Sequence, residues 1–511
     1  KSQHIFVSLA LPKPDVLRAA HAGAPLSCAG YVFRHKGTEG SFARGARVLT
    51  PNGAADPYDL SFKVRRIQDF WSHSWHAPVA RKVATLLFTY NGLPAAVSST
   101  VAAFCGAGLS AADVLPPMVY EQSEDGSRTL GYAVWAQAFG ICSFLVVLLL
   151  WWSRRTVFLD KVCIHQTDAA LKQQGVESIG GFLRHSDFMV VLWDDTYARR
   201  LWCIFEVAAF AKTHSSDLSK RLRIVPIDLG LVLLAFFVVA CLTSVFYMLT
   251  PKRFRLLLGV AFVLVGYSPC AWILRRYSRK LSTLWKDLQG FSVRSANCYC
   301  CSVGHADPET KSQLACDRKV VEFCIVQWFG CLDAFDDFVR VDLLNHFRAE
   351  LGCHGFSYRW AVLAMTPLIW WQCETISAYL RADAEDSGLL VALTLSTLAA
   401  WLFNGPLAVA AIMRLVGSMQ CLWDHWAVDA AVAFVGALLG GAVSWSVARL
   451  ELLAWEASPV LFAAVLVTEA TVTLAVYCRA VSSFLRAAGP SRDKPLAPSG
   501  GGLAPGHRPP G

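Results

Sequence analysis

Eight apolar segments, each long enough to cross a bilayer, limit what this chain can fold into. A helix rises 1.5 Å per residue, so about 20 apolar residues cross the roughly 30 Å of bilayer hydrocarbon. The segments lie near 84–106, 131–152, 229–249, 255–274, 360–380, 388–413, 428–450 and 459–480. Only 17% of the 511 residues are charged, whereas soluble domains carry roughly a quarter. The sequence therefore predicts a polytopic α-helical membrane protein with about eight spans, embedded in a lipid bilayer.

The charges beside these segments predict their orientation. Cations flank one side of the spans, at Arg81, Lys82, Arg154, Arg155, Arg275 and Arg276. The loops at 110–130 and 381–387 carry acidic residues instead. Because cytosolic loops carry an excess of Lys and Arg, we expect both termini and the polar segments in the cytosol. Three cations contradict this topology because they fall in a loop on the far side, namely Lys252, Arg253 and Arg255.

The net charge of +9 is explained by these flanking cations, so we expect no nucleic-acid partner. The chain has 17 cysteines, and none lies in the loops placed on the far side, near 110–130, 381–387 and 451–458. This distribution predicts reduced thiols that face the cytosol, because disulfides belong to oxidising compartments. Because the chain begins with Lys1 instead of Met, we expect it to be a piece of a longer product.

Alternating polar and apolar sequence divides the chain. We expect a cytosolic segment with a first strand at 1–82, a transmembrane hairpin at 84–152, an α/β core at 153–228, a second hairpin at 229–274, a cysteine-rich cytosolic α/β continuation at 275–359, a four-span region at 360–482 and a disordered tail at 489–511. The tail is rich in Pro, Gly and Ser, so it has too few apolar residues to form a core.

The cytosolic parts predict alternating strands and helices. The expected strands are Ile67 to Trp71, Thr156 to Asp160, Phe188 to Trp193 and Leu222 to Ile227. Apolar residues at helical spacing predict helices over 176–185, 199–213, 281–288, 317–329 and 333–350. This alternation favours a parallel sheet covered on both faces. The run FSVRSANC, which begins at Phe291, is expected to supply a fifth strand. The membrane hairpins then interrupt the domain and reach opposite edges of its sheet.

One cytosolic run of about 55 residues carries motifs in a characteristic order. From Val157 to Phe210 it contains FLDKVCIHQ, LKQQGVESIGGFLRHS and FMVVLWDDTYARRLWCIFEVAAF. The positions that define the order are Asp160, Gly175, Ser186, Tyr197, Trp202, Cys203 and Glu206. This order resembles the TIR (Toll/interleukin-1 receptor) domain, and DKVCIHQ is also similar to the D-x-x-C-I-x-Q signature of HET domains. The resemblance implies a flavodoxin-like α/β fold, a role in signalling and self-association through the domain.

The resemblance also implies candidate site residues. In TIR domains that cleave NAD, the catalytic residue is a glutamate on the helix after the third strand, which corresponds to Glu206. A carboxylate suits this task because it stabilises developing positive charge and accepts hydrogen bonds from hydroxyls. Ligands of open α/β sheets bind beyond the carboxyl ends of the strands. There we expect the residues that bind NAD, the candidate substrate, namely Ser72, His73, Asp160, Lys161 and Trp202.

Simpler interpretations of these residues stay open. Glu206 could form a structural ion pair with a neighbouring cation (Arg199, Arg200 or Lys161), and the Gly-x-Asp-x-Arg element of plant TIR domains is absent. His73 could bind phosphate beside its two serines, but a turn residue bonded to the backbone is the simpler interpretation.

Cysteines downstream of the core could bind zinc, which needs four ligands, commonly in closely spaced pairs. Cys298 and Cys301 form one such pair, with His305 after them. Cys316 and Cys324 are too far apart for the second pair of a ribbon or finger, so the spacing disfavours structural zinc.

Two carboxylates, Glu374 and Glu469, lie within apolar segments, where a charge is costly and marks a candidate functional site. Asn404 with Pro406 indicates a helix break of the kind that transporters use. Three hypotheses follow. The chain is a multi-pass TIR-like signalling protein, with or without NAD cleavage; a non-catalytic scaffold that self-associates; or a transporter or channel that uses the two carboxylates. We favour the first.

Overall fold

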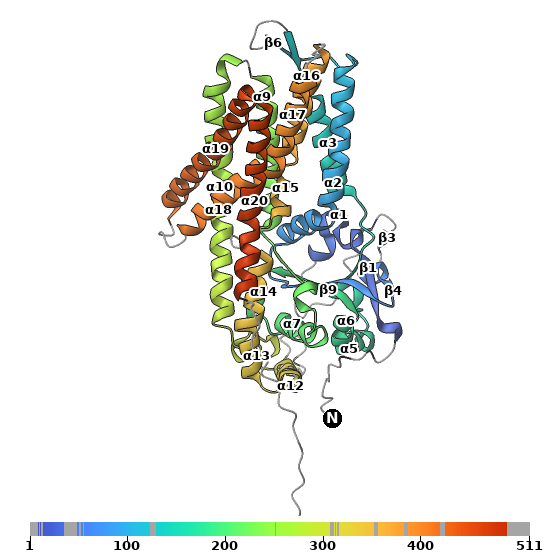
Figure 1. Cartoon of the computed structure of the whole chain (residues 1–511). Helices are drawn as coiled ribbons and strands as arrows, with labels where there is room; N and C mark the ends of the chain where they lie inside the picture. The colour runs from blue at the N-terminus through green and yellow to red at the C-terminus, as the bar shows by residue number, and fades with distance from the viewer. Residues whose placement is uncertain are drawn as a thin grey trace, which may run out of the picture.

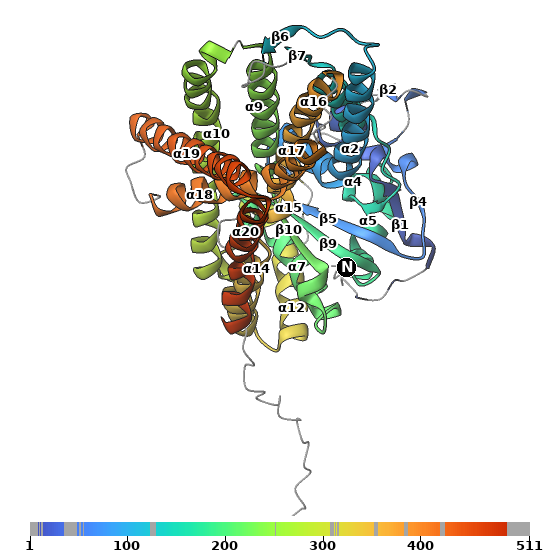
Figure 2. The ribbon, with the colours of Figure 1, turned by 45° about the horizontal axis from the view of Figure 1, so that its top comes forward.

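The computed structural model describes residues 9, 11, 14–34, 49–50, 53–54, 56–122, 129–250, 252–306, 311, 313, 316–351, 356–382, 387–419 and 425–487. Long apolar helices occupy one end of the molecule, and a sheet with shorter helices occupies the other (Figure 1). A turned view places α10 (Lys252–Gln289) and α19 (Trp426–Ala457) on the left and the strands on the right (Figure 2). The predicted tail at 489–511 lies outside the described residues.

The sheet has six strands within the described residues, in the spatial order β10–β9–β5–β8–β1–β4. Their bounds are Arg18–His21 (β1), Phe62–Lys63 (β4), Ile67–His73 (β5), Thr156–Phe158 (β8), Ser186–Trp193 (β9) and Leu222–Pro226 (β10). The four predicted strands are confirmed as β5, β8, β9 and β10, which run parallel. In chain order these four lie 4-3-1-2 across the sheet, which matches the flavodoxin-like doubly wound order.

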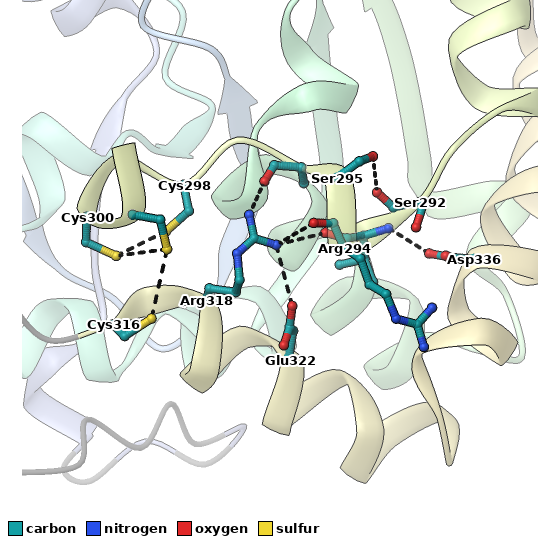
Figure 3. A network of polar contacts seen from close by, with 12 residues as sticks. Ser292, Arg294, Ser295, Cys298, Cys300, Cys316, Arg318, Glu322 and Asp336 are labelled. Carbon is teal, nitrogen blue, oxygen red and sulfur yellow. Dashed lines mark hydrogen bonds and ion pairs between the residues drawn. The ribbon is translucent and has the colours of Figure 1, made fainter. Parts of the chain in front are cut away.

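The predicted fifth strand is wrong. The run FSVRSANC instead forms a short 3-10 turn, η4 (Val293–Ser295). The guanidinium of Arg318 donates to the carbonyls of Arg294 (2.9 Å), Val293 (3.4 Å) and Ala296 (Figure 3). The side chain of Arg318 thus takes the place that a neighbouring strand would have as hydrogen-bond donor. The two additional strands come from the N-terminal segment, because β1 pairs antiparallel with β8 and β4 pairs antiparallel with β1.

Short helices cover the sheet broadly as predicted. The helix expected over 176–185 is divided into α5 (Ala169–Glu177) and α6 (Ile179–Arg184), because the Ser178 hydroxyl bonds back to the Gln174 carbonyl at 2.7 Å. The helix expected over 199–213 is α7 (Leu201–Thr213), and the one over 317–329 is α12 (Asp317–Phe329). The remaining helices around the sheet are α1 (Gly23–Arg34), α4 (Asp160–Cys163), α8 (Leu218–Arg221), α11 (Tyr299–Ser302), α13 (Leu332–Phe338) and α14 (Leu344–Leu351).

Five stretches of the described residues are helical, long and apolar enough to span a membrane. They are Val79–Ala111 (α2), Leu229–Phe246 in α9 (Leu229–Leu249), Gly388–Ser418 (α17, η6 and α18), Trp426–Ala457 (α19) and Pro459–Tyr477 in α20 (Pro459–Ala487). The third stretch consists of three elements: α17 (Ser387–Ala399), the π-helical turn η6 (Ala400–Asn404) and α18 (Gly405–Ser418). These helices agree with an integral membrane protein that crosses the bilayer several times.

The other three predicted spans differ from expectation. The span at 131–152 contains a shorter apolar helix, α3 (Trp135–Leu150). The span at 360–380 is divided between α15 (Tyr358–Ala364) and α16 (Pro367–Arg381), because a proline at the first position of a helix starts a new one. The span at 255–274 belongs to α10, whose side chains at 252–253 and 255–267 lie outside the described residues. The three cations of the predicted far-side loop belong to the first turn of this helix.

The chain passes between sheet and bundle without a separate connecting domain. Helix α2 starts just after β5 and turns back along it. Lys82 donates to the Ser74 carbonyl (2.6 Å) beyond the strand, and two turns later Tyr90 contacts Trp71 and Asp69 within it. From α3 the chain returns to β8 through an extended linker at 151–155, which hydrogen bonds to the backbone at 22–23. One continuous hydrophobic core therefore joins the sheet to the long helices.

Candidate functional site

Three elements bring a serine, a tyrosine and a glutamate together at the carboxyl edge of the sheet. Ser72 lies near the end of β5, Tyr197 opens the turn η3 (Tyr197–Arg199) after β9, and Glu206 lies on α7. The Ser72 hydroxyl donates to the Glu206 carboxyl and lies 2.5 Å from the Tyr197 hydroxyl. The structure thus brings together Ser72 and Glu206, two of the residues predicted from the sequence. Tyr197 belongs to the same motif order but was not predicted as a site residue.

The surroundings of Glu206 favour its neutral form. Burial raises the pKa of this carboxyl to about 8, and the negative charge of Asp160 adds to the rise, whereas the hydrogen bond from Ser72 opposes it. Burial also raises the pKa of Tyr197 well above its ordinary value. Arg199 pairs with Asp287 at 3.3 Å and not with the glutamate. The carboxyl is therefore mostly protonated at neutral pH.

Asp160 and Lys161 both contact Trp75, which was not predicted as a site residue. Asp160 accepts a hydrogen bond from the Trp75 indole nitrogen at 2.9 Å and another from the Lys161 backbone at 2.7 Å. The Lys161 ammonium stands 3.9 Å from the centre of the Trp75 ring. Burial raises the pKa of Asp160 and lowers that of Lys161. Trp75 lies four residues after the end of the predicted strand, so its position near the expected edge was the available signal.

His73 is the last residue of β5 and is 7% exposed. Its ring packs 4.4 Å from Trp75 and 5.6 Å from Phe33, between ring centres. Burial, with the nearby charge of Lys82, holds the pKa of His73 well below its ordinary value. Its Nε2 atom has no hydrogen-bond partner among the described residues. A neutral imidazole packed among aromatic rings does not supply the charge that phosphate binding favours.

Trp202 turns toward α12 and does not join the contact between Ser72 and Glu206. Its indole nitrogen donates to the first residue of that helix, Asp317, at 3.1 Å. The ring also packs edge-on against Phe205, with centres 5.4 Å apart. Trp202 therefore fixes α7 against α12, and the structure supports a positioning role for it.

Two cavities lie at this edge of the sheet. The first, of about 190 Å³, opens beyond β9 and β10, where Asp228 pairs with Arg81 (2.7 Å) and Lys280 (2.5 Å). The second, of about 760 Å³, is lined by Arg199, Arg200 and the segment 295–302. Glu206 lines neither cavity. The Ser72 hydroxyl occupies one oxygen of this carboxyl, so a ligand that bonds to this oxygen must displace the hydroxyl.

The two carboxylates predicted as sites within apolar segments have different contacts. Glu374 accepts a hydrogen bond from the Ala136 backbone amide in the first turn of α3, so it caps that helix. Glu469 on α20 interacts with Glu451 on α19, and both are buried, at 7% and 6% exposed. The predicted helix break at Asn404 is the π-helical turn η6.

Comparison of the chain with protein-family models, with curated proteins and with solved structures gave no match. What the chain does must therefore be inferred from its own residues. The strongest geometric feature is the contact of Ser72, Tyr197 and Glu206 at the edge where open α/β sheets bind ligands.

Proposed function

We propose that the chain is a TIR-like signalling protein of the membrane that cleaves NAD with Glu206. One observation supports this proposal most. Glu206 lies at the carboxyl edge of a sheet in doubly wound order, bonded to Ser72 from the first parallel strand. We place the α/β part and both termini in the cytosol, because cations flank the spans on that side.

The proposed reaction breaks the bond between nicotinamide and ribose. The bonding electrons leave with nicotinamide, the ribose carbon gains oxocarbenium character, and water adds to it with release of a proton. Glu206 acts in its ionised form, which is the minor form at neutral pH because its pKa is raised to about 8. The carboxylate stabilises the developing positive charge and accepts hydrogen bonds from ribose hydroxyls. A ribose hydroxyl takes the place of the Ser72 hydroxyl that occupies this carboxyl in the structure.

The test is NAD turnover by the full chain in detergent or lipid vesicles, followed by release of nicotinamide. Glu206→Gln keeps the shape of the side chain but cannot ionise, so turnover should fall at least about 100-fold. Glu177→Gln, on the surface helix α5, is the matched control and should keep wild-type turnover. Equal turnover by wild type and Glu206→Gln would remove the residue from the mechanism. If the wild type self-associates but turns over no NAD, the chain is a non-catalytic scaffold.

A second candidate function is transport through the bundle. A cavity of about 490 Å³ between the long helices is lined by Asn404, Ser444 and Glu451, beside the π-helical turn η6. Glu451 interacts with Glu469 on the next helix. Paired intramembrane carboxyls can bind a proton or cation.

The transport candidate is tested with the purified chain in vesicles. A proton or cation flux should depend on the paired carboxyls and should fall in Glu469→Gln. Glu374→Gln removes a carboxyl outside the pair and serves as the comparison, because its amide oxygen can still accept the hydrogen bond from the Ala136 amide. Absence of flux for protons and common monovalent and divalent cations would exclude this function.

A further inference from the structure

Three cysteines and a histidine from separate parts of the cysteine-rich segment converge. Their donor atoms, the sulfurs of Cys300, Cys301 and Cys316 and a ring nitrogen of His305, all lie within 4.8 Å of one another. Figure 3 shows the sulfurs of Cys298, Cys300 and Cys316 close together between α11 and the start of α12. The sequence had disfavoured zinc on the wide spacing to Cys324. The structure gathers a different set, in which Cys316 and not Cys324 completes the group.

The separations within this set agree with one tetrahedral metal ion. Zinc binds sulfur at about 2.3 Å and imidazole nitrogen at about 2.0–2.1 Å, so tetrahedral geometry places two sulfurs about 3.8 Å apart and a sulfur and nitrogen about 3.6 Å apart. The Cys301 sulfur lies 4.0 Å from those of Cys300 and Cys316 and 3.6 Å from His305 Nε2. A disulfide requires about 2.05 Å, so these cysteines are not bonded to one another.

The backbone is shaped to bring the donors together. Cys300 and Cys301 lie on α11, and a turn at Gly304 and His305 reverses the chain. Both turn residues adopt left-handed φ angles of 65° and 60°, which is uncommon for a histidine. The His305 amide donates to the Cys300 carbonyl at 2.7 Å, which closes the turn and directs the imidazole toward Cys301.

Neighbouring groups complete the surroundings of the cluster. The Asp317 backbone amide lies 3.3 Å from the Cys300 sulfur and donates to it. Such donors orient thiolate ligands and offset their charge. Cys316 lies at the N-terminal cap of α12, where the helix dipole favours a negative sulfur. A cysteine-rich cluster in the part of the chain expected in a reducing compartment is a site for metal and not for disulfides.

We propose that Cys300, Cys301, His305 and Cys316 bind one structural Zn²⁺ ion. Three sulfurs and one imidazole nitrogen suit zinc, and four protein ligands leave no open position for a substrate or water. The ion joins α11 to the start of α12. The residues just beside the cluster contact α7, because the Asn297 carbonyl accepts from the Leu201 amide at 3.1 Å and the Asp317 carboxylate accepts from the Trp202 indole at 3.1 Å. The zinc site thus holds the start of the helix that carries Glu206.

The test is the zinc content of the full chain, purified in detergent under reducing conditions and passed over a chelating resin. We expect about one zinc ion per chain. Cys301→Ser and Cys316→Ser should each lower the content below roughly a fifth of wild type, because a structural site rarely survives the loss of a thiolate. Cys331→Ser is the matched control, since this exposed cysteine caps α13 outside the cluster and should leave the zinc content unchanged.

Two measurements on the wild type keep the proposal testable if a variant folds poorly. The first is alkylation mapped by mass spectrometry, in which zinc should protect Cys300, Cys301 and Cys316 until a strong chelator is added. The second is hydrogen exchange, which should rise at 297–306 and in the first turn of α7 after chelation. A wild type without zinc, bound iron in its place, equal zinc in Cys316→Ser, or exchange unchanged by chelation would each overturn the proposal.

Discussion

Glu206→Gln should make the protein more stable, although it should abolish turnover of NAD. In the wild type, burial raises the pKa of Glu206 from 4.5 to about 8. The unfolded chain ionises this carboxyl above about pH 4.5, whereas the folded chain keeps it protonated up to about pH 8. Folding must therefore bind a proton throughout this window, and the stability of the wild type falls as pH rises. Glutamine does not ionise, so folding of the variant binds no proton at this position and its stability carries no such pH-dependent loss.

The magnitude follows from the pKa difference. Each unit of pKa difference corresponds to about 1.4 kcal/mol, so the advantage of glutamine is about 1 kcal/mol at pH 5.5 and about 4 kcal/mol at pH 7.5. The advantage should therefore widen by roughly 2–3 kcal/mol between these pH values and stay constant above about pH 8. Other titrating groups are common to both proteins, so they cancel in the comparison.

The assay is thermal or chemical unfolding of both proteins in the same detergent, followed by tryptophan fluorescence across this pH range. Asp195→Asn removes an exposed carboxyl at the same edge of the sheet and serves as the control for loss of a negative charge there. A Glu206→Gln protein that is less stable than wild type, or whose advantage does not change with pH, would show that Glu206 is ionised in the folded state. Stabilisation together with lost activity is the behaviour of a residue retained for function.

Ser72→Ala removes the hydrogen bond that holds the glutamate pKa down, so the pH midpoint of NAD turnover should shift to a more alkaline value; an unshifted profile would argue against the contact. Arg155→Met should cost about 3 kcal/mol of unfolding free energy, because Asp69, 1% exposed, loses its ion-pair partner. Adding Asp69→Asn should recover part of this loss, and no recovery would refute the electrostatic explanation. Gly230→Ala would place a methyl group 2.4 Å from the α2 backbone, so stability should fall by about 3 kcal/mol. The control Gly108→Ala meets nothing within 4 Å, and equal losses in the two variants would contradict the packing argument.

The central strands were predictable because each is short, rich in large apolar residues and close to polar residues that end it. β9 is the clearest case, since Met189–Trp193 is buried and the run carries no polar residue. Strands β1 and β4 were missed because they are short, at four and two residues, and RAAH and FK carry no β-branched residue. β1 pairs with β8, which lies far away in sequence, and β4 pairs with β1.

The candidate site was predictable only in part, and for a similar reason. Motif order placed Glu206 on its helix and Ser72 at a strand end, and parallel strands carry their carboxyl ends to one edge. The partner of Trp202 is Asp317, more than a hundred residues later, and local pattern could not identify it. The proposed metal ligands were not identified as a set from the sequence, because finger and ribbon spacings assume two closely spaced pairs. Here the left-handed turn at His305 closes the set.

The interruption of the α/β part by membrane helices has a mechanical consequence. Helices α2 and α9 cross where Gly230 lies against the backbone of Thr85, and the Thr85 hydroxyl bonds both the Gly230 amide (2.9 Å) and the Ile227 carbonyl (2.7 Å). Ile227 follows β10 directly, and α2 follows β5, the strand that carries Ser72. A change in the packing of these two long helices must therefore move the strand ends that hold the site, because close-packed elements shift together. In the proposed signalling protein, the bilayer helices are thus part of the structure that positions Ser72 and Glu206, and not an anchor alone.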